Sequence, residues 1–237
     1  MNSDEKSQIN STKQPESVVV KFWSLFWTVA WIALIILLVM RIFVFQQVNV
    51  VGSSMEPNYH TDERLVVNRR NKNFERGQVV AAYSDPAVAI NATPLTPYDP
   101  STRFFLKRIV GLPGESIEVV GGSVVIYNDQ FPNGRILEEA YLDENVKLRQ
   151  DILKEYVPRT QIPQGYYYLL GDNRSNSQDS RNPDVGPFPE YSIFGQETFR
   201  YWPLNKAEVF ERPNYDYIEL DRQFELKRAE YSNSSEQ

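Results

Sequence analysis

One long apolar run dominates the hydropathy pattern near the start of the chain. From Phe22 to Met40, nineteen residues include only two polar side chains, Ser24 and Thr28. A helix of this length spans about 28 Å, close to the hydrocarbon thickness of a bilayer. A buried core helix or a cleaved signal peptide would be the alternative, but a secretory apolar core usually has only about 7–15 residues. We therefore predict a retained transmembrane helix at 22–40, after a polar tail at 1–21.

Beyond residue 40 the pattern changes to short apolar or alternating runs separated by turns, which is typical of β-strands. Strands are predicted at residues 43–51, 64–67, 78–83, 103–110, 116–120, 124–127 and 166–170. The stretch 128–163 is more charged and is interpreted as an insertion with a short helix near 148–156. Residues 206–237 are predicted to form a polar, peripheral tail. The expected architecture is therefore mainly β, with one antiparallel domain at 41–205.

Charge and composition exclude several classes of function. The 237 residues carry 31 acidic and 25 basic side chains, and the net charge of −6 disfavours a nucleic-acid partner. The absence of cysteine excludes a cysteine nucleophile, disulfides and thiolate metal sites. A single histidine, His60, excludes a multi-histidine metal centre. Any other catalytic base must be a carboxylate, a tyrosine or a lysine, and nothing calls for a metal or organic cofactor.

Three segments carry candidate chemistry, and the first is Gly-Ser-Ser-Met-Glu-Pro at residues 52–57. A serine after a predicted strand, next to glycine and before a proline-bounded turn, can present its hydroxyl and backbone N–H in one direction. A nucleophile with an oxyanion hole requires this arrangement. The alternative for this segment alone is an ordinary polar turn.

The second segment is the predicted strand that contains Lys107. Side chains alternate along a strand, so Lys107 shares a face with Phe105 and Ile109, while Arg108 points the opposite way. Apolar neighbours desolvate an amine and lower its pKa. A shift from about 10.4 to about 7 represents about 4–5 kcal/mol of differential environment. Lys107 is thus a candidate base, with a solvated surface lysine as the alternative.

The third segment is the polar stretch 171–181, Gly-Asp-Asn-Arg-Ser-Asn-Ser-Gln-Asp-Ser-Arg, which follows an apolar strand. Such a loop could hold a lysine through a serine hydroxyl and brace itself with Asp–Arg pairs. A polar surface loop or a cation site built from its two aspartates is the alternative.

The three motifs, in this order behind an apolar helix, resemble type I signal peptidase, and the segment 76–80 resembles a further box of that family. The likeness covers residues 41–203 and implies an all-β, partly coiled sheet domain. It implies that Ser54 is the nucleophile and Lys107 its general base. It also implies that Ser177 orients the lysine and that Asp179 and Arg181 brace the loop.

The same resemblance implies a second supporting pair, Asp172 with Arg108. It assigns three apolar residues to the pocket for the small side chains of the substrate: Val50, Met55 and Leu106. Two positions depart from the family pattern. Gly52 stands where some members have a serine that donates to the oxyanion hole, and Asn58 replaces a common threonine.

The function expected from this resemblance is cleavage of N-terminal signal peptides from exported preproteins, after small residues at −1 and −3. The expected partners are preproteins and the lipid bilayer, with the protein translocation channel as a further candidate. Lys13 and Lys21 precede the helix and only Arg41 closely follows it, a weak bias for a cytoplasmic N-terminus and an extracytoplasmic catalytic domain in the cell membrane. Only fourteen positions separate Met40 from Ser54, so the site should lie near the bilayer.

Three rival functions remain open on sequence grounds. A Ser–His–Asp hydrolase would use His60, which lies only six residues after Ser54 across a turn. A self-cleaving repressor would share the serine–lysine chemistry but needs a DNA-binding helical domain. A membrane-tethered module that binds extended peptides, or an inactive relative, would bind without turnover.

Overall fold

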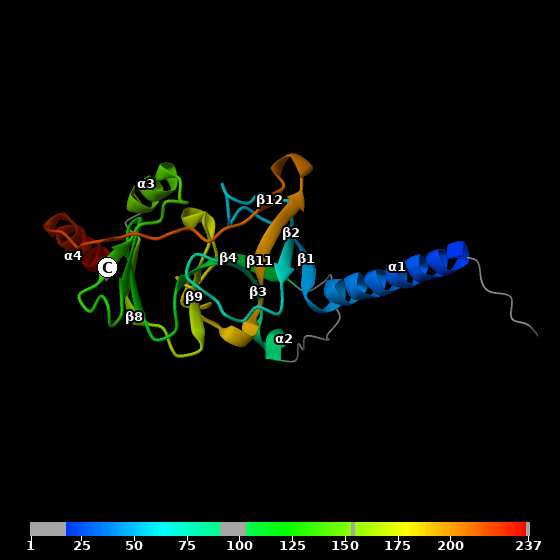
Figure 1. The fold of residues 1–237 in the computed structure, drawn as a ribbon. Helices are drawn as coiled ribbons and strands as arrows, with labels where there is room; N and C mark the ends of the chain where they lie inside the picture. Colours follow the sequence, from blue (N-terminus) through cyan, green and yellow to red (C-terminus); the bar gives the residue numbers. More distant parts are fainter. Residues whose placement is uncertain (1–17, 91–102, 153–154, 236–237) are drawn as a thin grey trace, which may run out of the picture. The chain divides into compact units, whose positions relative to one another are not determined.

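The computed structural model describes residues 18–90, 103–152 and 155–235 (Figure 1). The chain separates into two compact units, Met1–Arg41 and Ile42–Gln237. The tail predicted at residues 1–21 lies mainly outside the described residues.

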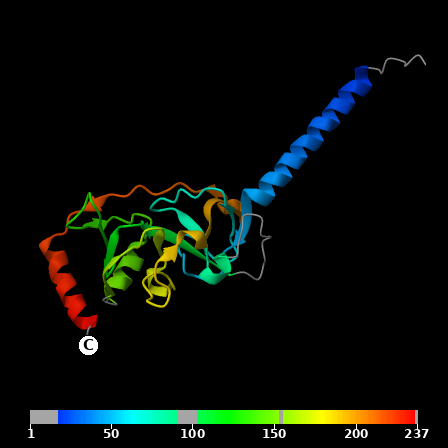
Figure 2. The same cartoon turned by 90° about the horizontal axis from the view of Figure 1, so that it is seen from below.

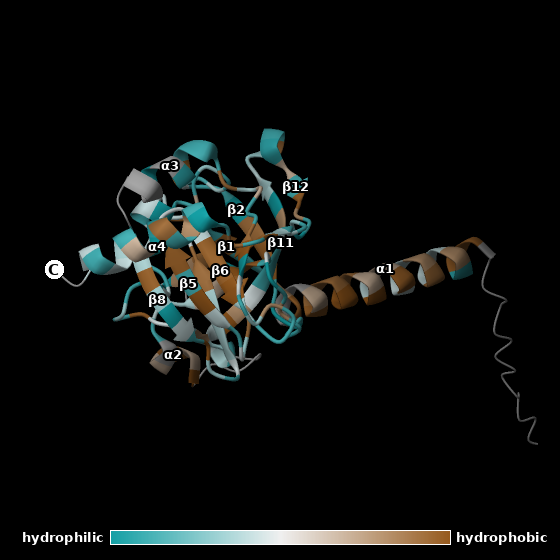
Figure 3. Cartoon of the chain, turned by 90° about the vertical axis from the view of Figure 1, so that its left-hand side faces the viewer, coloured by the Kyte–Doolittle hydropathy of each residue, from teal (hydrophilic) through white to brown (hydrophobic). Residues whose placement is uncertain are grey.

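Helix α1, Val18–Phe43, lies in the first unit except for its last two residues, and it continues a few residues beyond each end of the predicted span. Its stretch Val19–Met40 is long and apolar enough to cross a membrane, and none of it is buried within the protein. Figure 3 shows apolar residues along nearly its whole length. A soluble helix would bury one apolar stripe and expose a polar face. By length and composition, α1 is therefore a candidate membrane span.

The second unit begins with an antiparallel sheet of eight strands. The strand order is β1-β2-β11-β3-β4-β9-β10, and β12 pairs with β11. The strands are β1 Phe45–Asn49, β2 Arg64–Asn68, β3 Val79–Tyr83, β4 Phe104–Gly111, β9 Tyr166–Leu170, β10 Phe188–Pro189, β11 Ile193–Trp202 and β12 Glu208–Val209. Short helices lie in the connections: α2 Pro86–Ile90, η1 Arg174–Asn176, η2 Glu190–Ser192 and η3 Leu204–Lys206.

A second antiparallel sheet has the order β13-β7-β6-β5-β8. Its strands are β5 Ser116–Val120, β6 Ser123–Tyr127, β7 Arg135–Leu137, β8 Tyr156–Gln161 and β13 Tyr217–Ile218. The stretch interpreted as an insertion, 128–163, supplies β7, helix α3 (Glu144–Ile152) and β8, and so belongs to this sheet. The helix predicted near 148–156 begins earlier, and Tyr156 already starts a strand.

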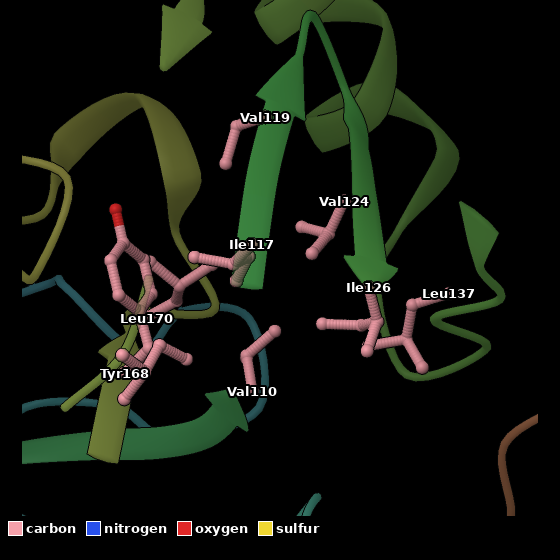
Figure 4. Close-up of a cluster of buried hydrophobic side chains, with 9 residues drawn as sticks. Val110, Ile117, Val119, Val124, Ile126, Leu137, Tyr168 and Leu170 are labelled. Carbon is pink, nitrogen blue, oxygen red and sulfur yellow. The ribbon is translucent and has the colours of Figure 1, made fainter. Parts of the chain in front are cut away.

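The two sheets share one apolar core. Val110 of β4 and Tyr168 and Leu170 of β9 pack against residues of the second sheet (Figure 4). The second sheet contributes Ile117, Val119, Val124, Ile126 and Leu137 to this cluster. The common core fixes the ends of β4 and β9, the strands that carry the predicted lysine and lead into the polar loop. The mainly β, antiparallel fold behind an N-terminal apolar helix is confirmed.

Two further features differ from the sequence-based expectation. β11 was not among the predicted strands, because Glu197 and Arg200 interrupt its apolar pattern. Both are nonetheless buried, and Arg200 forms an ion pair with Glu63 at 2.9 Å.

The segment beyond residue 205 is not a peripheral tail. It runs back from the first sheet to the second (Figure 2) and ends in α4, Arg222–Ser235. Phe224 and Tyr231 of α4 are buried against Val120, Val125 and Tyr127 of the second sheet. Only two apolar residues of α4 make this contact, too few for a clear amphipathic pattern in the sequence.

Candidate active site

The serine predicted as nucleophile lies in the turn that follows β1. The base of this turn is closed by the backbone of Val50, whose N–H donates to Glu63 O at 2.9 Å and whose carbonyl accepts from Asp62 N–H at 3.1 Å. Gly52 has a φ of +90°, a left-handed conformation that other residues rarely adopt. A serine at this position would be strained, so Gly52 suits the backbone conformation of this turn.

The polar loop after β9 holds this turn from the other side. Asn173 N–H donates to Ser54 O at 3.0 Å, and Asn173 Nδ2 donates to Ser53 O at 3.0 Å. Asn176 Nδ2 donates to Ser53 Oγ at 2.9 Å. Two consecutive carbonyls of the nucleophile turn are thus fixed by one asparagine. Sequence reasoning assigned no role to Asn173, although it lies within the motif that carried the resemblance.

Lys107 lies near the middle of β4 and reaches the serine. Its Nζ is 2.7 Å from Ser54 Oγ and 3.0 Å from Leu106 O. The side chain is 2% exposed, and its amine lies 5.3 Å from the centre of the Phe105 ring. The structure therefore brings the two residues together from positions 53 apart in the sequence, within reach for direct proton transfer.

Burial lowers the pKa of Lys107 to about 8, because the amine is removed from water. The carboxylates of Asp179 and Asp172 oppose this shift, and the Arg181 guanidinium favours it. With such a pKa, Lys107 is neutral in roughly a tenth of the protein molecules at pH 7 and in most of them above pH 9. Only the neutral form can accept the serine proton.

Asp179 and Arg181 form the expected brace of the polar loop. Arg181 donates from Nε to Asp179 Oδ1 and from Nη2 to Oδ2, both at 2.8 Å, and from Nη1 to Glu155. Gly171 N–H donates to Asp179 Oδ2 at 3.0 Å. Burial alone would raise the pKa of Asp179, but the hydrogen bonds and the charge of Arg181 outweigh it and hold that pKa below its usual value. The loop thus carries a fixed, ionised carboxylate beside the lysine.

Gly171 allows the loop to approach the serine. A Cβ at this position would lie 2.2 Å from Ser177 Oγ and 2.4 Å from Ser54 O, so no larger residue fits without a shift of the backbone. Ser177, expected to orient the lysine, has a buried hydroxyl beside Asp179, whose pKa it helps to lower. That hydroxyl makes no hydrogen bond of good geometry to any described residue, the lysine included.

Asp172 and Arg108 form the second expected pair, on the opposite face of β4 from the lysine. Arg108 donates from Nε to Asp172 Oδ1 at 2.9 Å and from Nη2 to Oδ2 at 2.6 Å. Asn58 Nδ2 also donates to Asp172 Oδ2, at 2.8 Å. Asp172 N–H lies 3.5 Å from the sulfur of Met55. This pair links β4, the nucleophile turn and the polar loop.

A small pocket adjoins the serine and the lysine. Its free volume is about 40 Å³, and its walls come from the end of β1, the nucleophile turn and the start of β4. The three residues expected to shape a substrate pocket, Val50, Met55 and Leu106, all line it. Such a volume suits a methyl group far better than a branched or aromatic side chain.

Two other candidate chemistries find no support in the geometry. His60 is nearly half-exposed, and its ring lies 3.7 Å from the carboxylate of Glu56, four residues earlier in the chain. Within residues 18–90, 103–152 and 155–235, no group of three or more His, Cys, Asp or Glu residues could hold a metal ion.

Sequence reasoning missed a buried network behind the polar loop. Arg174 forms an ion pair with Glu139, with Nη1 2.9 Å from Oε2, and its Nε donates to Gly171 O at 3.1 Å. Both side chains are almost fully buried. Arg174 lies in the recognised motif, but Glu139 lies in the stretch interpreted as an insertion, and nothing in its local sequence indicates this contact.

Comparison with known proteins agrees with the geometry. The family model described as signal peptidase, peptidase S26, matches residues 23–202. Signal peptidase I P of Bacillus subtilis subsp. natto is 34% identical over 182 residues, covering 74% of this chain and 86% of the relative. Signal peptidase I S of Bacillus subtilis (strain 168) is 34% identical over 183 residues, with the same coverage.

A crystal structure of a signal peptidase I from Enterococcus faecalis V583 shares 27% identity with this chain. The match covers 52% of this chain and 96% of the other, with a TM-score of 0.36. The family model spans most of the chain, and the two Bacillus relatives match about three quarters of it. The resemblance seen in the motifs is therefore confirmed, and the chain belongs to the signal peptidase family of serine peptidases, peptidase S26.

Proposed function

We propose that this peptidase cleaves signal peptides from exported preproteins, with Ser54 as nucleophile and Lys107 as general base. The observation that carries the proposal is the 2.7 Å approach of Lys107 Nζ to Ser54 Oγ, made by an amine that is 2% exposed. Burial lowers the pKa of this amine to about 8, so a neutral base is available near physiological pH. A lysine in water would stay protonated and could not take the serine proton.

The substrate would bind as an added strand. Among the described strands, β1 lies at the end of the first sheet and pairs with β2, so its other edge can pair with an extended peptide. Substrate residues two apart would then face the same way. The residue at −1 would enter the pocket of about 40 Å³ beside Ser54, which admits small side chains only. The residue at −3 would face the same wall, which explains a preference for small residues at both positions.

The reaction would proceed in two steps. Ser54 Oγ attacks the scissile carbonyl carbon while neutral Lys107 Nζ takes the hydroxyl proton. The resulting lysinium gives this proton to the leaving amine, and an acyl-enzyme ester remains on Ser54. Water then attacks the ester carbonyl, Lys107 takes a proton from that water, and the proton returns to Ser54 Oγ as the cleaved signal peptide leaves with a free carboxyl group. No step requires a metal or an organic cofactor.

The apolar helix α1 would anchor the enzyme in the lipid bilayer where its substrates emerge. A cleavage site lies just beyond the membrane-embedded part of a signal peptide, and anchoring both partners to one surface raises their effective concentration. The weak charge bias around the helix favours a cytoplasmic N-terminus and an extracytoplasmic catalytic unit in the cell membrane. The protein translocation channel is a candidate partner at the same surface.

Two substitutions test the catalytic assignment. Ser54→Ala and Lys107→Ala are each expected to abolish cleavage of a preprotein peptide with alanine at −3 and −1, while the protein stays folded. Ser84→Ala and Lys72→Ala are the matched controls, and both variants should retain activity. The Ser84 hydroxyl donates to Arg103 O, and the Lys72 amine donates to Ile193 O in a partly buried position. Substantial processing by either catalytic variant would overturn the assignment. Binding of the peptide without turnover by the unaltered protein would instead favour a peptide-binding module.

A further inference from the structure

Tyr141 contacts the nucleophile turn, the lysine strand β4 and the polar loop after β9, although it lies outside all three. It belongs to the short connection between β7 and α3, within the stretch first interpreted as an insertion. Its carbonyl accepts a hydrogen bond from Asn58 Nδ2, in the nucleophile turn, at 3.1 Å. Its ring lies under the guanidinium of Arg108 on β4, 4.0 Å from the ring centre. Its hydroxyl accepts from Arg174 Nη2, in the polar loop, at 3.2 Å.

The hydroxyl and the ring of Tyr141 act on different parts of this network. The hydroxyl donates to Glu139 Oε1, the carboxylate that pairs with Arg174. The ring covers Arg108, which with Asn58 holds both oxygens of Asp172. Asp172 directly follows Gly171, the residue packed against Ser54 and Ser177. A displaced Tyr141 would therefore loosen contacts that reach the nucleophile turn and the lysine strand together.

We propose that Tyr141 is a positioning residue for the serine and the lysine, through which the second sheet holds the nucleophile turn, β4 and the polar loop in register. This inference rests on the proposed function of Ser54 and Lys107. Tyr141 touches neither residue, so it acts through Asn58, Arg108 and Arg174. The connection between β7 and α3 would thus contribute to catalysis, whereas the neighbouring strands contribute to the fold.

Loss of the ring would change both the geometry and the electrostatics of the site. A cavity of about 360 Å³ is lined by Tyr141, Arg108 and Asn58 among other residues. Without the ring, water from this cavity could reach the Arg108–Asp172 pair. The charge of Asp172 raises the pKa of Lys107, and water would screen that charge. The pKa of Lys107 should then change, and the midpoint of the rise of activity with pH should move with it.

Tyr127 of β6 provides a matched control within the same sheet. Its hydroxyl donates to Glu118 Oε2 and accepts from Arg228 Nη2, both at 2.6 Å. The guanidinium of Arg159 lies over its ring, 4.0 Å from the ring centre. This tyrosine therefore has the same kinds of partner as Tyr141, a carboxylate and two arginines. Its partners lie in the second sheet and α4, away from the catalytic segments.

The experiment compares Tyr141→Leu with Tyr127→Leu in the full-length protein. The measured quantities are kcat, KM and the pH dependence of kcat on a peptide with alanine at −3 and −1, together with Tm. Both variants should lower Tm. Tyr141→Leu should also lower kcat at least about tenfold, since a displacement of 1 Å can cost about a hundredfold. Its KM should stay within about twofold, and the midpoint of its pH profile should differ from that of the unaltered protein.

Tyr141→Phe should recover most of the lost kcat, because it keeps the ring over Arg108 and the carbonyl for Asn58. If Tyr141→Leu does not fold, Tyr141→Met and Tyr127→Met provide the same comparison, since methionine adapts to irregular space. The inference is overturned if a Tyr141 variant loses stability as its Tyr127 counterpart does but keeps kcat and the pH midpoint. It is equally overturned if neither Tyr141 variant folds while both Tyr127 variants do, because Tyr141 would then be a folding residue only.

The Ser54→Ala and Lys107→Ala variants separate this inference from the proposed function. If both are inactive and the Tyr141 variants are normal, the catalytic assignment stands and the positioning role fails. If either catalytic variant is active, the assignment itself fails, whatever the Tyr141 variants show.

Discussion

Replacing Gly171 by alanine tests how closely the polar loop must approach the nucleophile turn. The added Cβ would lie 2.4 Å from Ser54 O and 2.2 Å from Ser177 Oγ. Ordinary van der Waals contact begins at 3.4 Å, so the Ser54 carbonyl must move by 3.4 − 2.4, or about 1 Å. Such a displacement costs about a hundredfold in rate. This corresponds to about 2.7 kcal/mol of transition-state stabilisation.

The assay is kcat on a signal-peptide substrate, measured beside the free energy of unfolding in urea. Gly122→Ala is the matched control, because its Cβ, in the turn between β5 and β6, would meet Lys147 O of α3 at 2.7 Å, away from the serine. Both variants should lose about 1–3 kcal/mol of stability through overpacking. Only Gly171→Ala should lose about a hundredfold in kcat. A Gly171→Ala enzyme that is destabilised but turns over at the normal rate would refute the reasoning.

Three further predictions concern the same site. Asp172→Asn leaves the buried Arg108 without a charged partner and should lower the free energy of unfolding in urea by about 3–5 kcal/mol. A decrease below about 1 kcal/mol would show that the ion pair is dispensable for stability. Gly52→Ser places a side chain at a φ of +90° and should lower the free energy of unfolding by about 1–2 kcal/mol without raising kcat. A gain in kcat would instead show that the oxyanion hole lacks a hydroxyl donor. Lys107 has a folded-state pKa of about 8, below the unfolded value of 10.5, so the folded protein binds fewer protons between these pH values and stability should rise with pH there. Lys107→Met should remove that rise, and an unchanged slope of unfolding free energy against pH would contradict it.

Strand alternation was enough to predict the two faces of β4. Lys107 and Phe105 lie together, and Arg108 points to Asp172, because a period of two holds wherever a strand is regular. The chain order of the three motifs was enough to predict the family. Both kinds of prediction depend on residues that are close in sequence or on a motif of known order.

The contacts that hold the site together depend on long-range packing and could not be predicted. Glu139 meets Arg174, 35 positions later, because two sheets share one core. β11 was missed because its buried charges look polar in sequence, although Arg200 is neutralised by Glu63. A hydrophobic pattern does not indicate where a buried ion pair will form. The role of the connection that carries Tyr141 is accordingly visible only in the structure.

The central claim is that a buried amine with a lowered pKa lies beside the serine, and the titration of Lys107 itself tests it most directly. The measurement is the ¹³Cε chemical shift of Lys107 against pH in the folded protein, assigned by its loss in Lys107→Met. Burial predicts a midpoint of about 8. A midpoint near the ordinary lysine value of about 10.4 would contradict the account.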